Sequence, residues 1–252
     1  MAGNYYDSDR GLSEYLLFHY GPVKPLLANW TETGALDFPA RCVSECLDTA
    51  LLPEKARALD LGCAVGRSSF ELARSCPEVI GIDFSKRFID VANHLRERGS
   101  VRFKSFEEGE LTSPRKAIVP NDMDRRRAKF EVGDATKLRP DLGKFDVVLA
   151  ANLIDRLDAP LKFLERLPEL LHSGGQLIIV SPYTWLASYT PRKNWLGGFV
   201  RGGRSVRTYD ALRRILLPDF KFVRRLDLPF LLREHARKYQ LGIAEASVWV
   251  RR

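Results

Sequence analysis

The sequence contains no apolar run that approaches the ~20 residues of a membrane-spanning helix. Its start, MAGNYYDSDRGLSEY, lacks the basic-then-apolar order of a signal peptide. The four cysteines form no C-x-x-C pair and the four histidines are scattered, so neither a metal site nor a disulfide framework is expected. Internal repeats and low-complexity linkers are also missing. We therefore expect one soluble, cytoplasmic domain spanning residues 1–252, without a bound metal and without membrane contact.

Positive charge is in excess, with a formal net charge of +8, which could indicate an anionic partner. The arginines are, however, spread along the chain, and the run Arg125–Arg127 follows two acids, Asp122 and Asp124. A nucleic-acid footprint requires basic residues interleaved with exposed aromatic residues on one face, which the sequence does not establish. We expect no nucleic-acid partner, while an anionic cofactor or substrate stays open.

Short apolar runs alternate with amphipathic stretches over most of the chain. The first helix is predicted over residues 8–20, and a second begins with Asp37 near its N-cap and Pro39 in its first turn, ending near Leu51. Strands are then predicted at 57–61, 78–83, 129–134, 144–152 and 176–183, with helices at 68–75, 85–99 and 159–175. This alternation predicts an α/β fold with a parallel sheet and helices on both faces.

Three segments depart from the alternation. Residues 100–128 are too long for an ordinary connection and predict an insertion, with a hairpin built on VRFKSF. Residues 184–205 form a second long connection, rich in aromatic residues, arginine and glycine, for which a function is expected. Residues 219–228 and 245–252 could pair as antiparallel strands at the edge of the sheet.

A glycine-rich turn connects the first strand to the next helix. Its spacing is D-x-G-x-x-x-G, with Asp60, Gly62, Cys63 and Gly66, and it differs from the dinucleotide fingerprint G-x-G-x-x-G. Glycines permit the close backbone approach that a ligand requires. An acid at the strand tip would repel a pyrophosphate but suits the cationic amino-acid tail of a ligand.

Acids also end the next two strands. Asp83 could accept both hydroxyls of a ribose, Asp134 beside Ala135 could accept from an adenine amino group, and Phe84 could pack on the adenine ring. Taken singly, Asp83 could be a helix cap and Asp134 a turn residue. Together, the three acids match the ammonium, ribose and adenine of S-adenosylmethionine.

Residues 57–183 resemble the class I methyltransferases, whose Rossmann-like fold implies a seven-stranded, mostly parallel sheet. The nucleic-acid amino-methyltransferases of this fold carry an N/D-P-P-Y/F motif after the fourth strand, where this chain has Ala150-Ala151-Asn152-Leu153. A small-molecule acceptor is therefore favoured. Asn152 could bind the substrate or the sulfonium side of the cofactor, or it could cap the following turn.

The flanking segments resemble a narrower family, the thiohistidine N-methyltransferases of ovothiol biosynthesis. The similar segments are SEYLLFHYG (13–21), ALDFPARC (35–42), EEGELT (107–112), SPYTWL (181–186) and REHARKYQ (233–240). The resemblance implies methylation of an imidazole nitrogen of 5-thiohistidine, which yields ovothiol A and S-adenosylhomocysteine. That family often carries an iron-dependent sulfoxide synthase in the same chain. This sequence has no histidine cluster for iron, so the resemblance implies a separate synthase as a pathway partner.

The resemblance divides the chain into an N-terminal helical cap (1–52), a cofactor-binding core (53–183), and a substrate loop with a C-terminal strand pair (184–252). Within the cap, Tyr15, His19 and Tyr20 are expected in a lid over the cofactor.

Several side chains are candidates for the acceptor site, each with an ordinary structural alternative. Arg41 could grip a carboxylate or be a surface arginine. Tyr183 could orient the acceptor ring, and His235 or Glu234 could act as a base or hydrogen-bonding group. The aromatic residues expected to wall the pocket, or merely to pack, are Phe38, Trp185 and Trp195.

Three other functions stay open from the sequence. The first is methylation of another small amine or thiol. The second, suggested only by the positive charge, is an RNA or protein methyltransferase. The third is a non-catalytic partner subunit that keeps the cofactor fold.

Overall fold

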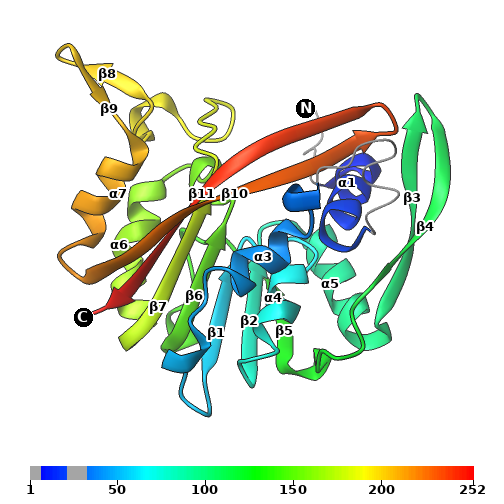
Figure 1. The fold of residues 1–252 in the computed structure, drawn as a ribbon, viewed down its shortest axis with the longest axis horizontal. Helices are drawn as coiled ribbons and strands as arrows, with labels where there is room; N and C mark the ends of the chain where they lie inside the picture. The colour runs from blue at the N-terminus through cyan, green and yellow to red at the C-terminus, as the bar shows by residue number, and fades with distance from the viewer. Residues whose placement is uncertain (1–6, 22–32) are drawn as a thin grey trace.

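A seven-stranded sheet forms the centre of the computed structural model, which describes residues 7–21 and 33–252 (Figure 1). The strand order is β10-β11-β7-β6-β1-β2-β5. Strands β5, β2, β1, β6 and β7 run parallel to one another, and β11 pairs antiparallel with both β7 and β10. Their bounds are β1 (Arg57–Leu61), β2 (Glu78–Asp83), β5 (Ala128–Val132), β6 (Phe145–Ala151), β7 (Leu171–Ser181), β10 (Phe220–His235) and β11 (Lys238–Arg251). The predicted seven-stranded, mostly parallel sheet is confirmed.

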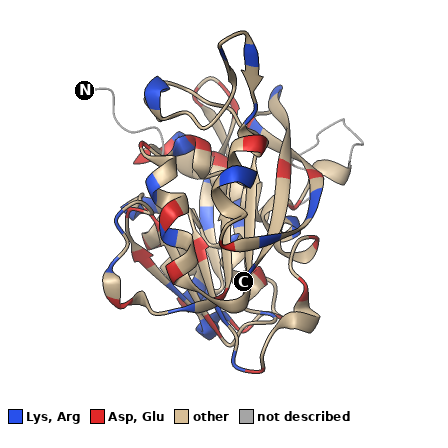
Figure 2. Cartoon of the chain, turned by 90° about the vertical axis from the view of Figure 1, so that its left-hand side faces the viewer, with Lys and Arg blue, Asp and Glu red and all other residues tan. Residues whose placement is uncertain are grey.

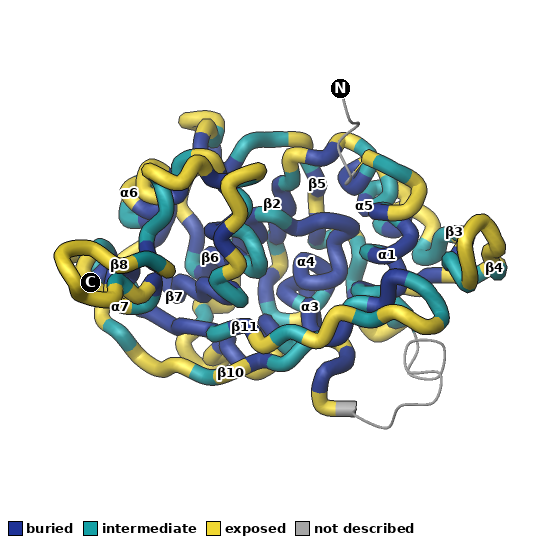
Figure 3. Tube along the Cα trace, turned by 90° about the horizontal axis from the view of Figure 1, so that it is seen from above, coloured by how far each residue is buried: buried dark blue, intermediate teal, exposed yellow. Residues whose placement is uncertain are grey.

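Helices cover both faces of this sheet because its strands are apolar on both sides. Helices α3 (Phe38–Ser44), α4 (Arg67–Leu72) and α5 (Lys86–Arg98) pack on one face, and α6 (Pro160–Leu170) and α7 (Thr208–Leu216) on the other. In β6, Val147 and Leu149 belong to the first core and Val148 to the second, as the two-residue period of a strand requires. Figure 3 shows the central strands β6 and β7 as mostly buried.

The order in which the chain adds strands to the sheet reverses at β1, so that later strands are added on its other side, beginning with β6. From β1 the sheet continues through β2 and β5 on one side, whereas β6 and β7 lie on the other. Ligands of open α/β sheets bind at such a switch point, outside the carboxyl ends of the strands. The topology therefore places the functional site above the tips of β1 and β6.

Helix α1 (Asp9–Tyr20) lies across this end of the molecule (Figure 1). Ser8 caps it, since its side chain accepts from Gly11 N. The Ser13 hydroxyl donates to Lys104 O, and the Tyr20 hydroxyl donates to Val65 O at 2.7 Å. These bonds tie α1 to the insertion and to the glycine-rich turn.

The predicted insertion is an antiparallel hairpin of β3 (Ser100–Glu108) and β4 (Leu111–Ile118). Ser85 and Gly99 cap the two ends of α5 as expected. The predicted C-terminal strand pair is also present, but it is longer than predicted: β10 and β11 form one continuous hairpin that turns at residues 236–237.

Several predicted boundaries are wrong. The helix that begins after Asp37 ends at Ser44 rather than near Leu51, and Asp37 has a φ of 51° and makes no side-chain cap. Residues 171–175, predicted as the end of a helix, belong to β7. The sequence interpretation also missed α7 and the short hairpin of β8 (Phe199–Arg201) and β9 (Arg204–Val206). In residues 7–21 and 33–252, no helix is both long and apolar enough to cross a membrane.

Candidate functional site

A cavity of about 530 Å³ opens at the carboxyl ends of the parallel strands, where the topology predicts a ligand site. The residues that follow β1, β2, β5 and β6 line its floor and sides. Helices α1 and α3 contribute its roof through Tyr15, Phe18, His19, Phe38 and Pro39. The predicted lid helix thus does border this cavity, although Tyr20 itself does not line it.

The glycine-rich turn forms one wall. Gly62 has a φ of +74°, and a Cβ there would lie 3.1 Å from Leu153 Cδ1. Ala64, whose φ is 47°, donates its backbone N–H to Asp83 Oδ2 at 2.9 Å. This bond holds the turn against the tip of β2, so the acid after β2 and the glycine-rich turn form one continuous wall.

Asp83 and Phe84 present a carboxylate and an aromatic face side by side. Asp83 accepts from Ala64 N and, through Oδ1, from Ser85 N at 2.8 Å. Burial raises the pKa of Asp83, while these backbone bonds oppose the rise. The Phe84 side chain is 72% exposed, yet it lines the cavity. An exposed aromatic ring beside a fixed carboxylate is suited to a nucleoside.

Asp134 and Ala135 follow β5, the strand that pairs with β2, and so lie at the neighbouring strand tip. Asp134 Oδ1 accepts from the backbone N–H of Thr136 at 2.8 Å and from its hydroxyl at 2.7 Å. Burial raises the pKa of Asp134, but the Thr136 bonds outweigh burial and hold it below its ordinary value. The carboxylate is therefore charged at neutral pH, and it lines the cavity together with Ala135.

Asn152 follows β6 and carries a polar atom without a partner. Its φ is 52°, a left-handed conformation that asparagine tolerates better than most residues. Its Oδ1 is buried and no described residue donates to it. A buried acceptor left unpaired costs about 1–3 kcal/mol, and this residue lines the cavity.

The charges of the cavity favour a cation. Three carboxylates line it, from Asp83, Asp134 and Asp158, against two cations, Lys137 and Arg156. Among the described residues, no three His, Cys, Asp or Glu side chains gather where they could hold a metal ion. Paired acids, an exposed phenylalanine and a glycine turn fit S-adenosylmethionine, a nucleoside with a positively charged sulfonium.

Comparison with known proteins supports this fit. Residues 35–217, more than half of the chain, match the family described as a methyltransferase domain. The chain belongs to this family, the class I S-adenosylmethionine-dependent methyltransferases.

Curated relatives of this methyltransferase are longer proteins. The ubiquinone biosynthesis O-methyltransferase of Cereibacter sphaeroides is 32% identical over 164 residues, which cover 63% of this chain and 55% of that protein. The ajmaline N-methyltransferase of Rauvolfia serpentina is 25% identical over 186 residues, covering 70% of this chain and 56% of that protein. The chain spans about half the length of these relatives.

A solved structure of a SAM-dependent methyltransferase from Methanosarcina mazei superposes with a TM-score of 0.52 and 19% identity, covering 80% of this chain and 95% of that one. At this identity the similarity concerns the fold alone.

Asp60 lies beneath the cavity rather than in its wall, which corrects the expectation that it faces the amino-acid tail of the cofactor. The residue is 1% exposed, and its Oδ2 accepts from the hydroxyls of Ser68 at 2.7 Å and Ser69 at 2.6 Å. Burial raises the pKa of Asp60 to about 6, while the two hydroxyls lower it. Asp60 therefore fixes the start of α4 relative to β1. Gly66 and the buried Cys63 also belong to this supporting layer and do not line the cavity.

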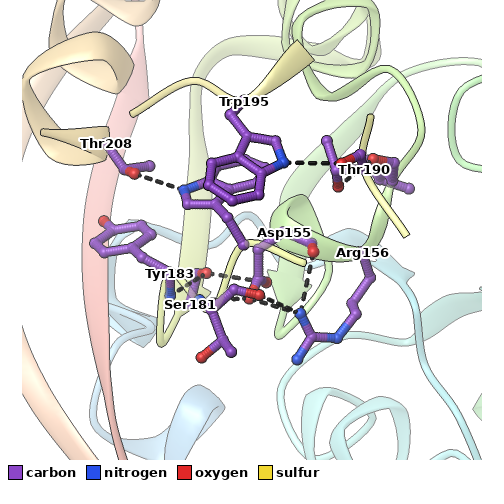
Figure 4. A network of polar contacts seen from close by, with 10 residues as sticks. Asp155, Arg156, Ser181, Tyr183, Thr190, Trp195 and Thr208 are labelled. Atoms are coloured by element: carbon purple, nitrogen blue, oxygen red, sulfur yellow. Dashed lines mark hydrogen bonds and ion pairs between the residues drawn. The ribbon is translucent and has the colours of Figure 1, made fainter. Parts of the chain in front are cut away.

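A polar network supports the side of the cavity near β6 and β7 (Figure 4). Asp155 is fully buried and accepts from Ser181 Oγ, Thr184 N and Arg156. Arg156 also donates to Thr184 O at 2.7 Å, and its guanidinium lies 5.0 Å from the centre of the Tyr189 ring. This network places Arg156 and Tyr189 in the cavity wall, and the sequence interpretation missed both.

Most residues predicted for the acceptor site have partners elsewhere. Arg41 donates to Pro229 O, Gly34 O and Glu45, and so ties α3 to β10. The Tyr183 hydroxyl donates to Glu245 on β11 at 2.7 Å. Trp185 and Trp195 stack on each other and donate to Thr208 and Thr190 O (Figure 4). None of these four lines the cavity.

The remaining two predicted acceptor residues, Glu234 and His235, lie at the tip of the β10–β11 hairpin. Glu234 pairs with Lys238 at 2.7 Å and accepts from Gln240, while His235 Nδ1 accepts from Arg237 N at 3.3 Å. Neither lines the cavity, so the structure does not support His235 or Tyr183 as catalytic groups. Of the predicted acceptor residues, it brings only Phe38 and Asn152 to the cavity.

Proposed function

We propose that this chain transfers a methyl group from S-adenosylmethionine to a small molecule. The observation that carries the proposal is the arrangement of Asp83, Phe84 and Asp134 around one cavity at the switch point of the sheet. Asp83, held by two backbone N–H groups, would accept from the ribose hydroxyls, and Phe84 and Asp134 would hold the adenine. Gly62 and Ala64 would lie along the amino-acid tail, while Asp60 positions α4 beneath them.

For the acceptor we propose 5-thiohistidine, methylated on an imidazole nitrogen to give ovothiol A. The resemblance of the flanking segments supports this choice, and the named curated relatives also methylate small molecules. A separate iron-dependent sulfoxide synthase would supply the thiohistidine. The acceptor would lie between Asn152, Arg156 and the aromatic roof, rather than against Arg41 and His235.

The protein contributes mainly by positioning. When bound, S-adenosylmethionine supplies an electrophilic methyl group, whose C–S bond breaks toward sulfur as the lone pair of the acceptor nitrogen forms the new bond. Phe18 and Phe38, whose rings stack with centroids 5.6 Å apart, exclude water from above. Asn152, which follows β6, would accept from a ligand in the cavity. Holding two reactants in line accounts for a large share of the rate in such displacements.

A basic segment favours a second candidate, methylation of RNA or of an acidic protein. Residues 184–225 contain ten lysines and arginines and two acids, a net charge of +8 that equals the net charge of the whole chain. The excess of positive charge is thus concentrated in this segment, which corrects the earlier inference that the arginines are spread along the chain. This segment includes β8, β9 and α7, at the end that Figure 2 turns toward the viewer. The aromatic rings there are covered by arginines, since Arg192 lies over Trp195 and Arg225 over Tyr209, which removes stacking faces for bases.

The experiment is a methyl-transfer assay read by mass spectrometry. Purified protein with S-adenosylmethionine should add one methyl group to 5-thiohistidine and none to plain histidine. Asp83→Asn should lower kcat/KM at least tenfold, because it removes the charge that accepts from the ribose. If only histidine or another amine is methylated, that compound replaces 5-thiohistidine as the proposed acceptor. If only RNA is methylated, the protein is instead an RNA methyltransferase. Donor binding without any product would indicate a non-catalytic subunit.

A further inference from the structure

His19 is the most unusual polar group in the cavity wall. It belongs to α1, is 5% exposed and lines the cavity. Its Nδ1 is buried, and no described residue offers it a hydrogen bond. An imidazole nitrogen left without a partner carries the same penalty as Asn152 Oδ1, so the structure contains two unpaired polar atoms around one cavity.

The surroundings of His19 keep it neutral. Burial, together with the nearby charge of Arg67, lowers its pKa to about 3. The neighbouring rings are aromatic, with Tyr15 at 5.8 Å, Phe18 at 5.5 Å and Tyr20 at 6.2 Å between centroids. A neutral imidazole offers one acceptor and one donor to a ligand and adds no charge.

The cofactor half of the cavity is already supplied with polar groups. Asp83 and Asp134 lie at the tips of β2 and β5, whereas His19 lies in the roof contributed by α1, to which α3 adds Phe38. Phe18 joins the two helices, since its ring stacks on that of Phe38. The roof thus combines flat apolar faces with one neutral polar atom, and this combination fits a small azole better than an alkyl amine.

We propose that His19 positions the methyl acceptor by forming a hydrogen bond with a ring N–H of a neutral azole. The inference rests on the proposed function and refines its substrate class. In a neutral imidazole one nitrogen carries a lone pair and the other carries a proton. The bond from the N–H to His19 directs the lone-pair nitrogen away from the roof and toward the floor of the cavity. His19 is a positioning residue and takes no proton itself.

The test compares His19→Phe with His19→Gln in the full-length protein. His19→Phe keeps a flat ring and removes the polar atom, whereas His19→Gln keeps a neutral hydrogen-bonding group. Calorimetry gives the dissociation constant of S-adenosylhomocysteine, and then that of 5-thiohistidine on protein saturated with S-adenosylhomocysteine. We expect His19→Phe to weaken 5-thiohistidine binding at least tenfold, with the S-adenosylhomocysteine constant unchanged within twofold, and His19→Gln to retain most of the affinity.

The outcomes separate this inference from the proposed function. If His19→Phe weakens the binding of both ligands equally, His19 contributes to donor binding or to folding, and the inference is overturned. Unchanged binding of 5-thiohistidine in His19→Phe overturns it as well. If the wild type binds S-adenosylhomocysteine but not 5-thiohistidine, the acceptor and this role of His19 both fail while the donor site stands. Absence of S-adenosylhomocysteine binding in folded wild type removes the proposed function itself.

Discussion

Gly66 occupies the most crowded position of the glycine-rich turn. Its φ is +85°, and a Cβ there would lie 2.6 Å from Phe130 Cζ, inside the core beneath the cavity. Two separate penalties therefore apply to any larger residue, namely a left-handed backbone and a steric overlap with a packed ring.

Gly66→Ala is expected to lower the free energy of unfolding by about 3 kcal/mol, as the sum of strain and overpacking. Gly109→Ala is the matched control, since its φ is +52° and no atom lies within 4 Å of the added Cβ. It should lose only about 1 kcal/mol, from the backbone alone. Urea unfolding measures both values. Equal losses would show that Phe130 moves aside freely.

At the scale of residues, the sequence predicted the acids that lie on strand ends and failed for residues with distant partners. Asp83 and Asp134 were predictable because parallel strands bring their carboxyl ends to one edge. Asp60 was misassigned because Ser68 and Ser69, in the first turn of α4, satisfy its carboxylate. Arg41 donates a hydrogen bond to Pro229 O, 188 residues away in the sequence, and no local sequence pattern predicts such a contact.

At the scale of elements, local signals predicted helices with clear caps and failed where tertiary pairing decides. Ser85 and Gly99 bracket α5 as expected. The sequence predicted a strand over residues 219–228, yet β10 continues through Pro229 to His235. The sheet order explains this, since β10 is an edge strand and one side of an edge strand requires no N–H donor.

Helix α1 is held in place partly by a buried acid. Glu14 is 2% exposed, and Arg10 Nε donates to it at 3.1 Å. Burial, together with the charge of Glu234, raises the pKa of Glu14 to about 7, while the charge of Lys238 opposes the rise. A carboxyl whose folded pKa lies above its ordinary value of 4.5 favours the docked state when protonated. Docking of α1 should therefore weaken as the pH rises from about 4.5 through 7.

Glu14→Gln should remove this dependence, because the amide keeps an acceptor for Arg10 without the charge. Hydrogen exchange of the α1 amides, corrected for intrinsic rates, should show protection falling between pH 5 and pH 8 in the wild type and changing little in Glu14→Gln. Glu45→Gln removes another arginine–glutamate pair four residues apart, on the surface of α3, and should behave as wild type. An identical fall in wild type and Glu14→Gln would exclude Glu14 as the cause.

At the scale of the whole molecule, the strand order concentrates function at one end. The alternation of strands and helices predicted the parallel sheet, and the order β5-β2-β1-β6-β7 then fixes the switch point between β1 and β6. Helix α1 and the β10–β11 hairpin come from opposite ends of the sequence, and they meet through Phe18 and Phe230, whose centroids lie 6.1 Å apart. The sequence predicted His19 in a lid over the cofactor, but no single-segment pattern could predict the contacts that place Arg156 and Tyr189 in the cavity wall.

The central claim, that the carboxylates after β2 and β5 hold the nucleoside of the methyl donor, is tested most directly by titrating folded protein with S-adenosylhomocysteine in a calorimeter. Binding at one site per chain is expected, with Asp83→Asn at least tenfold weaker because a charged hydrogen-bond acceptor contributes about 1.5–3 kcal/mol. Asp141→Asn, an exposed acid outside the cavity, should bind as wild type. Absence of heat with the wild type, or equal affinity of Asp83→Asn, would contradict the account.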